Sequence, residues 1–256
     1  MESIKNYEHY NTEMEKALAD KLFFTDYIKD CETFVDYGCA DGALLSKIRK
    51  LLPHAKLAGM DMDGEMLKKA AEKLPEAIFR QATLPVIIEG IDYGGAAINF
   101  SSVFHEVYSY CTNEQIDDFW KALNSVKYKY IIIRDMSCNI SAEEISDPED
   151  VKKVYAREEC AWQVKEFEDV WGPITYKRNL VHFLLKYRYL YNWSREVREN
   201  YIPLNSTTLL SNIDMEHYEI VYREEFVLPF IRQNVQEFFG IIWSAVCRKE
   251  QADGTD

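Results

Sequence analysis

The sequence predicts an α/β fold in which a parallel sheet is followed by a helical insertion. Short apolar segments alternate with amphipathic helical segments between residues 33 and 135, as in chains that wind a parallel sheet. The alternation then stops, and residues 141–200 show a helical pattern rich in charged and aromatic residues. Two strand-like runs, Tyr218–Leu228 and Phe239–Val246, follow this insertion. Because a short connection joins them, we expect these runs to pair in antiparallel fashion.

Five short apolar runs are expected to form the parallel strands. Each is followed by turn residues and then by a segment with helical spacing of its apolar residues. The strands are expected at Thr33–Asp36, Lys56–Asp61, Ala77–Arg80, Ala96–Ser101 and Tyr130–Asp135.

Capping signals predict where the intervening helices begin and end. The first helix is expected over Ala43–Leu52, because Pro53 cannot continue it. Asp63 is predicted to be the N-cap of the second helix. Thr112 and Gln115 match a capping box, which predicts the start of a third helix.

The length and composition are those of a globular domain. The chain has 256 residues, of which 47% are hydrophobic and 29% are charged. We expect one domain over residues 1–256, with an N-terminal helical segment over residues 1–30 and a helical cap inserted at residues 141–200.

The charge and the cysteine pattern narrow the class of protein. A formal net charge of −13 disfavours general binding to nucleic acids or anionic membranes, because the long-range field repels polyanions. The six cysteines form no C-x-x-C pair, so no metal site is expected.

The N-terminus lacks the apolar core of a signal peptide, and no apolar run approaches the roughly 20 residues of a membrane span. We therefore expect a cytoplasmic protein and leave its oligomeric state open.

The segment from Asp36 to Gly42 is the most informative part of the sequence. Gly38 and Gly42, with the small Ala40 between them, permit a tight turn that brings the backbone close to a ligand. The following helix offers the free N–H groups of its N-terminus. Asp61 ends the next strand, where a carboxylate can accept hydrogen bonds from ribose hydroxyls. The spacing differs from the dinucleotide signature G-x-G-x-x-G, and the alternative is an ordinary strand–turn–helix with a capping acid.

In these motifs the sequence resembles the class I S-adenosylmethionine-dependent methyltransferases. VDYGCADG looks like the first motif of that superfamily, and GMDMDGEML looks like the second. The resemblance implies a Rossmann-like, mostly parallel sheet of seven strands with a reversed last strand, and it implies S-adenosyl-L-methionine as cofactor. The residues that it implies for cofactor binding are Asp36, Gly38, Cys39, Ala40, Gly42, Asp61, Met62, Ala82, Ser101 and Ser102.

The resemblance also implies which part of the cofactor each of these residues contacts. The Gly38–Gly42 turn would contact the methionine part, and Asp36 would lie near its amino group. Asp61 would bind the ribose, and Met62 would flank the adenine. The superfamily often has an acid after the third strand that holds the adenine amine, whereas in this chain Gln81 or the backbone would have to do so.

Polar residues after the fourth and fifth strands are the candidates for chemistry, because ligands of open α/β sheets bind beyond the carboxyl ends of the strands. The catalytic candidates are His105, Tyr108 and Asp135. The substrate-binding candidates are Tyr7, Tyr10, Glu106, Tyr110, Arg134, Arg178 and His182. An imidazole suits proton removal, but His105 and Glu106 are also explained as residues that hold a loop. Arg134 and Asp135 are also explained as a local ion pair.

The helical cap contains a basic and aromatic stretch. Arg178, His182 and Lys186 are spaced so that they share one helix face. We expect this face to bind an anionic or aromatic acceptor and the cap to close over the pocket as a lid. The alternative is a solvated helix that pairs with acidic neighbours such as Glu166.

The predicted function is transfer of a methyl group from S-adenosylmethionine to an oxygen or nitrogen of a small molecule, by direct in-line displacement. Residues 99–102 match neither the (N/D)-P-P-(Y/F) nor the Pro-Cys motif of enzymes that methylate nucleic-acid bases. Three alternatives remain open: aminocarboxypropyl transfer or cyclisation of the same cofactor, methylation of RNA or protein, and a non-catalytic cofactor sensor.

Overall fold

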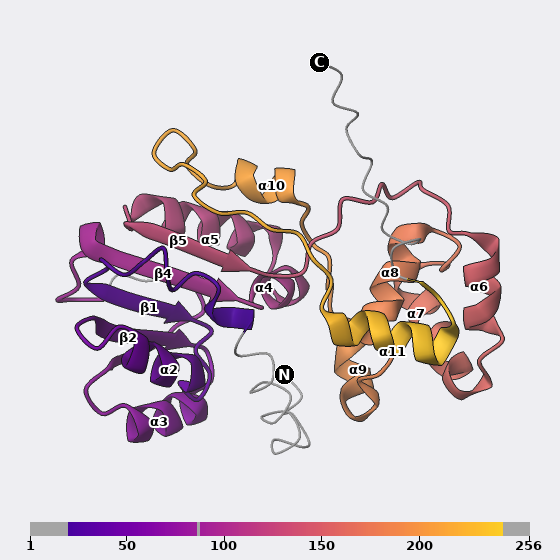
Figure 1. Cartoon of the computed structure of the whole chain (residues 1–256), viewed down its shortest axis with the longest axis horizontal. Coiled ribbons are helices and arrows are strands. Elements are labelled where there is room, and N and C mark those ends of the chain that lie inside the picture. Colours follow the sequence, from indigo (N-terminus) through magenta and orange to yellow (C-terminus); the bar gives the residue numbers. More distant parts are fainter. Residues whose placement is uncertain (1–19, 86–87, 243–256) are drawn as a thin grey trace. The chain divides into compact units, whose positions relative to one another are not determined.

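The computed structural model describes residues 20–85 and 88–242 and divides the chain into two compact units (Figure 1). In the described part, the α/β unit consists of residues 20–136 and 207–221, and the helical unit consists of residues 137–206 and 222–242. Tyr7, Tyr10 and most of the helical segment expected over residues 1–30 lie outside the described residues. The described end of that segment contains one short 3-10 helix, η1 (Asp20–Leu22), followed by turns.

The α/β unit is built on a parallel sheet with the strand order β3-β2-β1-β4-β5. The strands are β1 (Thr33–Tyr37), β2 (Lys56–Asp61), β3 (Ile78–Gln81), β4 (Ala96–Ser101) and β5 (Tyr130–Arg134). The predicted parallel α/β sheet is therefore confirmed, with boundaries that differ by at most one residue. Successive strands are added on one side of β1 up to β3 and on its other side from β4 onward, so the order of the strands reverses between β1 and β4. The carboxyl ends of these parallel strands form the switch point where such sheets bind ligands.

Helices cover both faces of this sheet (Figure 1). They are α2 (Ala43–Leu51), α3 (Gly64–Lys73), α4 (Phe104–Tyr110) and α5 (Asn113–Ser125). The predicted N-cap is confirmed, since the Asp63 carboxylate accepts hydrogen bonds from the backbone N–H groups of Glu65 and Met66 at 2.9 and 3.2 Å. The predicted capping box of Thr112 and Gln115 is also formed.

Side-chain alternation along β1 gives the sheet one core on each face. Phe34 belongs to the cluster that contains Leu45 and Ile48 of α2. Tyr37, three residues later, points to the other face and packs its ring against those of Phe100 and Phe119. All six side chains are buried, which fixes the position of the turn that follows β1.

The described residues form five strands rather than the expected seven, and the expected reversed last strand is not among them. Residues 218–228 form neither helix nor strand, and their apolar side chains lie largely in solvent: Ile220 is 49% and Val221 60% exposed. Phe239 ends a helix, α11 (Pro229–Phe239), and residues from 243 onward lie outside the described part. Pro229 at the start and the left-handed Gly240 at the end are the helix signals that the strand interpretation overlooked.

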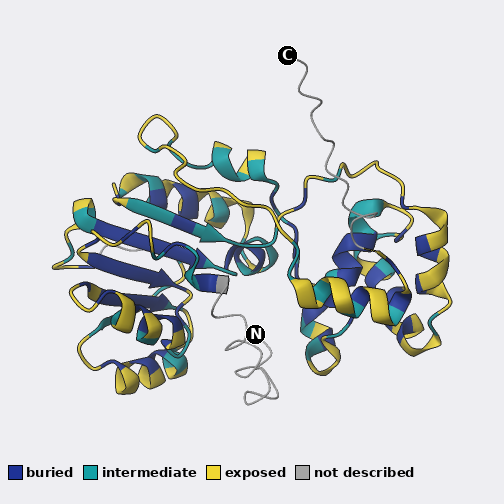
Figure 2. Ribbon diagram, viewed as in Figure 1, coloured by how far each residue is buried: buried dark blue, intermediate teal, exposed yellow. Residues whose placement is uncertain are grey.

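The helical unit packs its helices around an apolar core of its own. Its helices are α6 (Pro148–Tyr155), α7 (Ala161–Trp171), α8 (Lys177–Lys186), α9 (Trp193–Glu196) and α11, and α10 (Ser206–Ser211) follows α9 in the chain. Val154, Phe167, Phe183, Val235 and Phe239 are buried between them. Figure 2 shows these helices buried on one side and exposed on the other. No helix in the described residues is long and apolar enough to cross a membrane.

Candidate functional site

The turn between β1 and α2 has an unusual backbone. Gly38 and Gly42 both have φ of 75°, in the left-handed region that favours glycine. Ala40, between them, has φ of 45°, which is strained for a residue with a Cβ. The N–H groups of Gly38 and Cys39 both donate to the carbonyl of Met60, at 2.7 and 3.0 Å. The turn is therefore held against the end of β2.

Close packing also requires the two glycines. A Cβ atom on Gly38 would lie 2.7 Å from Cγ2 of Val103, and one on Gly42 would lie 3.1 Å from the Cβ of Ala70. The 2.7 Å distance at Gly38 is shorter than real Cβ atoms essentially ever show, so a side chain there would force the structure to shift. The two glycines are therefore required for the packing of the turn against Val103 and α3, while Gly38 itself is exposed at the carboxyl end of β1.

Asp61 joins the two sequence motifs. Its Oδ2 accepts a hydrogen bond from the N–H of Ala40, and its Oδ1 accepts one from the N–H of Asp63, both at 2.8 Å. A carboxylate has about four lone-pair positions, so each oxygen keeps the capacity to accept a further hydrogen bond. The two backbone contacts fix the carboxylate in place, which suits recognition of two neighbouring hydroxyl groups.

The residues around Asp61 have the character expected for an adenine site. The Met62 side chain is 47% exposed, so it is free to lie against a ring. Gln81 Nε2 donates to the carbonyl of Met62 at 2.9 Å, and the N–H of Ala82 donates to the carbonyl of Asp61 at 3.0 Å. The Gln81 amide that the sequence suggested for the adenine amine therefore holds the backbone of the second motif.

Buried polar groups lie at the ends of β1 and β4. Asn99 Nδ2 donates to Asp36 Oδ1 at 2.7 Å, and both side chains are buried. Burial raises the pKa of Asp36 to about 7. Asn99 Oδ1 and Ser101 Oγ are buried and have no hydrogen-bond partner among the described residues. Buried polar atoms are nearly always paired, so these two atoms are exceptions among the described residues.

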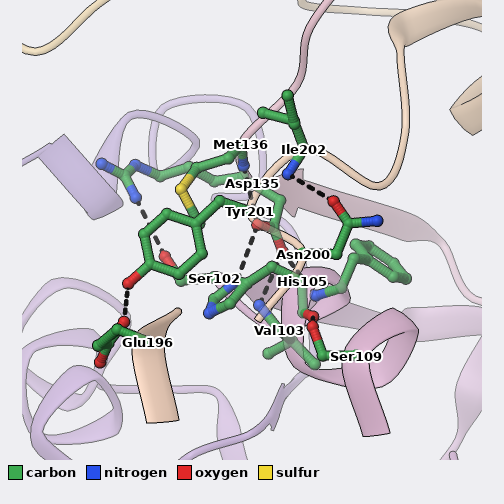
Figure 3. A network of polar contacts seen from close by, with 12 residues as sticks. Ser102, Val103, His105, Ser109, Asp135, Met136, Glu196, Asn200, Tyr201 and Ile202 are labelled. Carbon is green, nitrogen blue, oxygen red and sulfur yellow. Dashed lines mark hydrogen bonds and ion pairs between the residues drawn. The ribbon is translucent and has the colours of Figure 1, made fainter. Parts of the chain in front are cut away.

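Asp135 binds the beginning of α4 (Figure 3). Its Oδ2 accepts hydrogen bonds from the N–H groups of Val103 and Phe104 at 2.8 and 2.6 Å. Its Oδ1 accepts the N–H of Met136 at 2.8 Å and lies 3.2 Å from His105 Nδ1. Burial acts to raise the pKa of Asp135, but His105 and the backbone donors outweigh it and hold that pKa below its usual value. Asp135 therefore caps the helix and orients the buried His105 ring.

The other residues proposed near the reacting centre fall on α4 or beside it. Ser102 has φ of 61°; its N–H donates to the carbonyl of Arg134 at 2.7 Å, and Arg134 Nη1 lies 3.4 Å from its Oγ. The Tyr108 hydroxyl accepts a hydrogen bond from Trp120 Nε1 at 3.0 Å, which ties α4 to α5. Glu106 is partly buried, and Tyr110 is 47% exposed.

The predicted cap residues belong to the interior of the helical unit. His182 is 2% exposed, and its Nε2 accepts the N–H of Tyr201 at 3.1 Å. Burial holds the pKa of His182 well below its usual value. Lys186 is 0% exposed, and its Nζ donates to the carbonyls of Glu196 and Glu199 at 2.8 and 2.6 Å. The alternative of a solvated helix face is therefore wrong for these two residues.

Arg178 lies at the partly buried start of the same face. Its Nη2 donates to the carbonyl of Ile202 at 2.7 Å, within the helical unit. Among the described residues, no group of three or more His, Cys, Asp or Glu side chains could hold a metal ion. A buried lysine at the N-terminal edge of the α/β unit, Lys21, was missed, because no motif or spacing in the sequence marks it.

Comparison with known proteins supports the resemblance in the motifs. No family model matches the chain. The malonyl-[acyl-carrier protein] O-methyltransferase 1 of Ilyobacter polytropus is 28% identical over 121 residues, which are 47% of this chain and 42% of the relative. The chain thus spans less than half the length of the curated relative that it matches.

Solved structures also match part of the chain. DesVI of Streptomyces venezuelae covers 55% of this chain and 61% of its own, with 17% identity and a TM-score of 0.41. The plantazolicin methyltransferase BpumL, in complex with a pentazolic desmethylPZN analog and SAH, matches over 81% of this chain and 65% of its own, with 15% identity and a TM-score of 0.44. The comparisons confirm the resemblance to the class I S-adenosylmethionine-dependent methyltransferases, whose cofactor is S-adenosylmethionine.

Proposed function

We propose that this chain transfers a methyl group from S-adenosylmethionine to an oxygen or nitrogen atom of a small molecule. The observation that carries the proposal is the Asp61 carboxylate, which is fixed by the N–H groups of Ala40 and Asp63 beside the left-handed Gly38–Gly42 turn. A sharply turned backbone and a fixed carboxylate at one sheet edge suit the amino-acid and ribose parts of this cofactor. When bound, the cofactor supplies an electrophilic methyl group.

Different residues of the chain would bind the methionine, ribose and adenine parts of the cofactor. The turn with Cys39 and Gly42 would contact the methionine part, and the buried Asp36 would accept the amino group. Asp61 would accept the ribose hydroxyls, while Met62 and the backbone at Ala82 would flank the adenine. Ser101 Oγ, which has no partner among the residues described, and the adjacent Ser102 would complete the polar wall at the end of β4.

His105 and Asp135 are the proposed groups for proton removal. The 3.2 Å contact between His105 Nδ1 and Asp135 Oδ1 fixes the ring and stabilises its protonated form. An acceptor that carries a hydroxyl or an ammonium group must lose a proton during methyl transfer, and His105 would take it. A carboxylate acceptor needs no base, and His105 would then only position α4. Tyr108, Tyr110, Glu106 and Arg134 would line the acceptor side.

An oxygen acceptor is favoured by the name of the curated relative, which acts on malonyl-[acyl-carrier protein] as an O-methyltransferase. We propose direct in-line displacement, in which the protein aligns donor and acceptor and excludes water. Closure of the helical cap over the acceptor remains part of the proposal. A cytoplasmic setting fits the free thiols of the five described cysteines.

The experiment is to incubate the protein with S-adenosylmethionine and separate candidate acceptors, including malonyl thioesters, and to identify the nucleoside product by mass spectrometry. Formation of S-adenosylhomocysteine that depends on one acceptor supports methyl transfer. Methylthioadenosine as product would instead indicate transfer of the aminocarboxypropyl arm or cyclisation. Failure to bind S-adenosylmethionine or S-adenosylhomocysteine at all would contradict the proposed function.

A further inference from the structure

Tyr37, the last residue of β1, is hydrogen-bonded to the loop that follows β3. Its hydroxyl donates to the backbone carbonyl of Thr83 at 2.7 Å, although β2 lies between β1 and β3 in the sheet. No other side chain of the described residues is hydrogen-bonded to residues 82–85. The hydroxyl therefore ties the end of a central strand to the loop after an edge strand.

The Tyr37 ring is tightly packed, so its hydroxyl has a fixed position. The side chain is 7% exposed, and the ring packs against those of Phe100 and Phe119 with centroid distances of 5.3 and 5.5 Å. Burial raises the pKa of the Tyr37 hydroxyl, which therefore keeps its proton and remains a donor at neutral pH. Thr83 is exposed and lies in no helix or strand, so this contact fixes its carbonyl where packing does not.

The loop that Tyr37 holds begins beside the second motif. The N–H of Ala82 donates to the carbonyl of Asp61 at 3.0 Å. In the proposed function, Met62 and the backbone at Ala82 flank the adenine. The exocyclic amine of adenine then needs a hydrogen-bond acceptor in this region, and residues 78–85 contain no acid that could supply one.

A side-chain amide and a backbone carbonyl are the acceptors at this place. Gln81 Nε2 donates to the carbonyl of Met62 at 2.9 Å, and Gln81 Oε1 lies 3.2 Å from the point where a Cβ on Gly64 would stand. The exposed Gln81 amide therefore lies against the start of α3. The carbonyl of Thr83 has a second lone pair beside the one that Tyr37 uses. Because a buried hydroxyl holds it, this carbonyl is the better fixed of the two acceptors.

We propose that Tyr37 is a positioning residue for recognition of the adenine base. Its hydroxyl holds the loop after β3 so that the backbone carbonyl of Thr83 accepts the adenine amine. The inference deepens the proposed function, on which it rests for the identity of the cofactor. Hypoxanthine has an oxygen in place of the amine, so it brings two acceptors together and binds more weakly. Tyr37 acts on this selectivity through the backbone carbonyl.

The test compares Tyr37→Phe with Tyr130→Phe. The control removes a hydroxyl that donates to Asp30 at the same 2.7 Å, but at the amino end of β5. Gln81→Met removes the rival acceptor. Isothermal calorimetry would measure binding of S-adenosylhomocysteine, of methylthioadenosine, and of S-inosylhomocysteine, whose base is hypoxanthine. Circular dichroism would show whether each variant keeps the wild-type fold.

The wild type should bind S-adenosylhomocysteine at least about tenfold more tightly than S-inosylhomocysteine. Tyr37→Phe should reduce this ratio about three- to tenfold, which is the scale of one neutral hydrogen bond. It should weaken S-adenosylhomocysteine and methylthioadenosine by the same factor, because both carry adenine. A purely structural role would lower the stability and leave the ratio unchanged. Tyr130→Phe should keep the wild-type ratio.

Two kinds of failure are distinguishable. If the wild type binds S-adenosylhomocysteine but folded Tyr37→Phe keeps the wild-type ratio, the inference is overturned and the proposed function stands. A ratio that is lost in Gln81→Met and kept in Tyr37→Phe overturns the inference in the same way and assigns the adenine amine to Gln81. A folded wild-type protein that binds none of the three nucleosides contradicts the proposed function, and the inference with it.

Discussion

Asp61 Oδ2 accepts a hydrogen bond from the backbone N–H of Ala40 at 2.8 Å, which links the end of β2 to the turn after β1. The same carboxylate also accepts the N–H of Asp63 at 2.8 Å. Ala40 has φ of 45°, so this hydrogen bond helps to hold a strained turn. Asp61 therefore shapes the proposed cofactor site and, in our account, also binds the ribose directly.

Asp61→Asn should weaken S-adenosylhomocysteine binding by about 1.5–3 kcal/mol, the scale of a hydrogen bond to a charged group. The amide keeps the shape of the side chain but loses the charge and half of the accepting capacity. Calorimetry measures the affinity. Gly38→Val is a poorer probe, because its Cβ would lie 2.7 Å from Val103 Cγ2 and would disturb the fold as well.

The matched control is Asp63→Ala, two residues away. Asp63 caps α3, so this change should lower the free energy of unfolding by about 0.5–2 kcal/mol and leave ligand affinity nearly unchanged. If Asp63→Ala weakened ligand binding and Asp61→Asn did not, the ribose would be bound by a different aspartate from the one we propose.

The stability of the α/β unit should fall as the pH rises from about 4 to about 7. Burial raises the pKa of Asp36 to about 7, so the folded unit holds a proton that the unfolded chain has already released in this range. The stabilisation is complete below the pKa that Asp36 has in the unfolded chain. It is lost as the pH rises through the pKa that Asp36 has in the folded unit. Its size is on the order of a few kcal/mol.

Asp36→Asn should flatten this pH dependence, because the amide does not titrate. Urea denaturation of the ligand-free protein and the variant, at pH 5, 6, 7 and 8, measures the effect. A variant with the same slope as the wild type would show that another group causes the pH dependence.

His105→Gln should lower the rate of methyl transfer about 10²-fold if the acceptor carries a hydroxyl or ammonium group, because the proposed base is removed. S-adenosylhomocysteine affinity should change little. His54→Gln is the control, since His54 is exposed in the same unit. An unchanged pH–rate profile in His105→Gln would assign His105 to positioning α4.

Lys186→Glu should destabilise the helical unit by about 3–5 kcal/mol, because it places an unpaired acid where the ammonium now binds two backbone carbonyls. The Lys186 ammonium also lies 4.6 Å from the centroid of the Tyr201 ring, which favours a cation and disfavours an anion. Lys165→Glu, on the exposed side of α7, should change stability by less than about 0.5 kcal/mol. Equal effects in thermal unfolding would refute the structural role of Lys186.

If the helical cap acts as a lid, amide exchange in residues 141–200 should slow when S-adenosylhomocysteine and an acceptor bind together. Lids open at low energetic cost, so ligand-dependent protection is their direct signature. Hydrogen exchange followed by mass spectrometry measures it peptide by peptide. Equal exchange with and without ligands would remove the lid from the mechanism.

The sequence was sufficient for the parallel sheet because local signals and burial agree there. The predicted boundaries of β2 and β4 match the structure, and the caps at Asp63 and Thr112 are formed as predicted. Each of these signals depends on residues within a few positions of one another, which a single sequence displays.

Features that depend on distant contacts were missed or misjudged. Residues 218–228 have an apolar pattern like that of a strand, but a strand also requires a neighbour to pair with, and the structure provides none within the described residues. Arg178, His182 and Lys186 share a helix face as predicted, but whether that face is solvated depends on α7 and α9. The burial of Lys21 likewise depends on tertiary packing, so its sequence position gave no indication of it.

The most direct test of the account is calorimetric titration of the purified wild-type chain with S-adenosylhomocysteine. We predict saturable one-to-one binding that is markedly weakened in Asp61→Asn, with both proteins folded by circular dichroism. Absence of binding to the folded wild-type protein, or equal affinity in the variant, would contradict the proposed cofactor site.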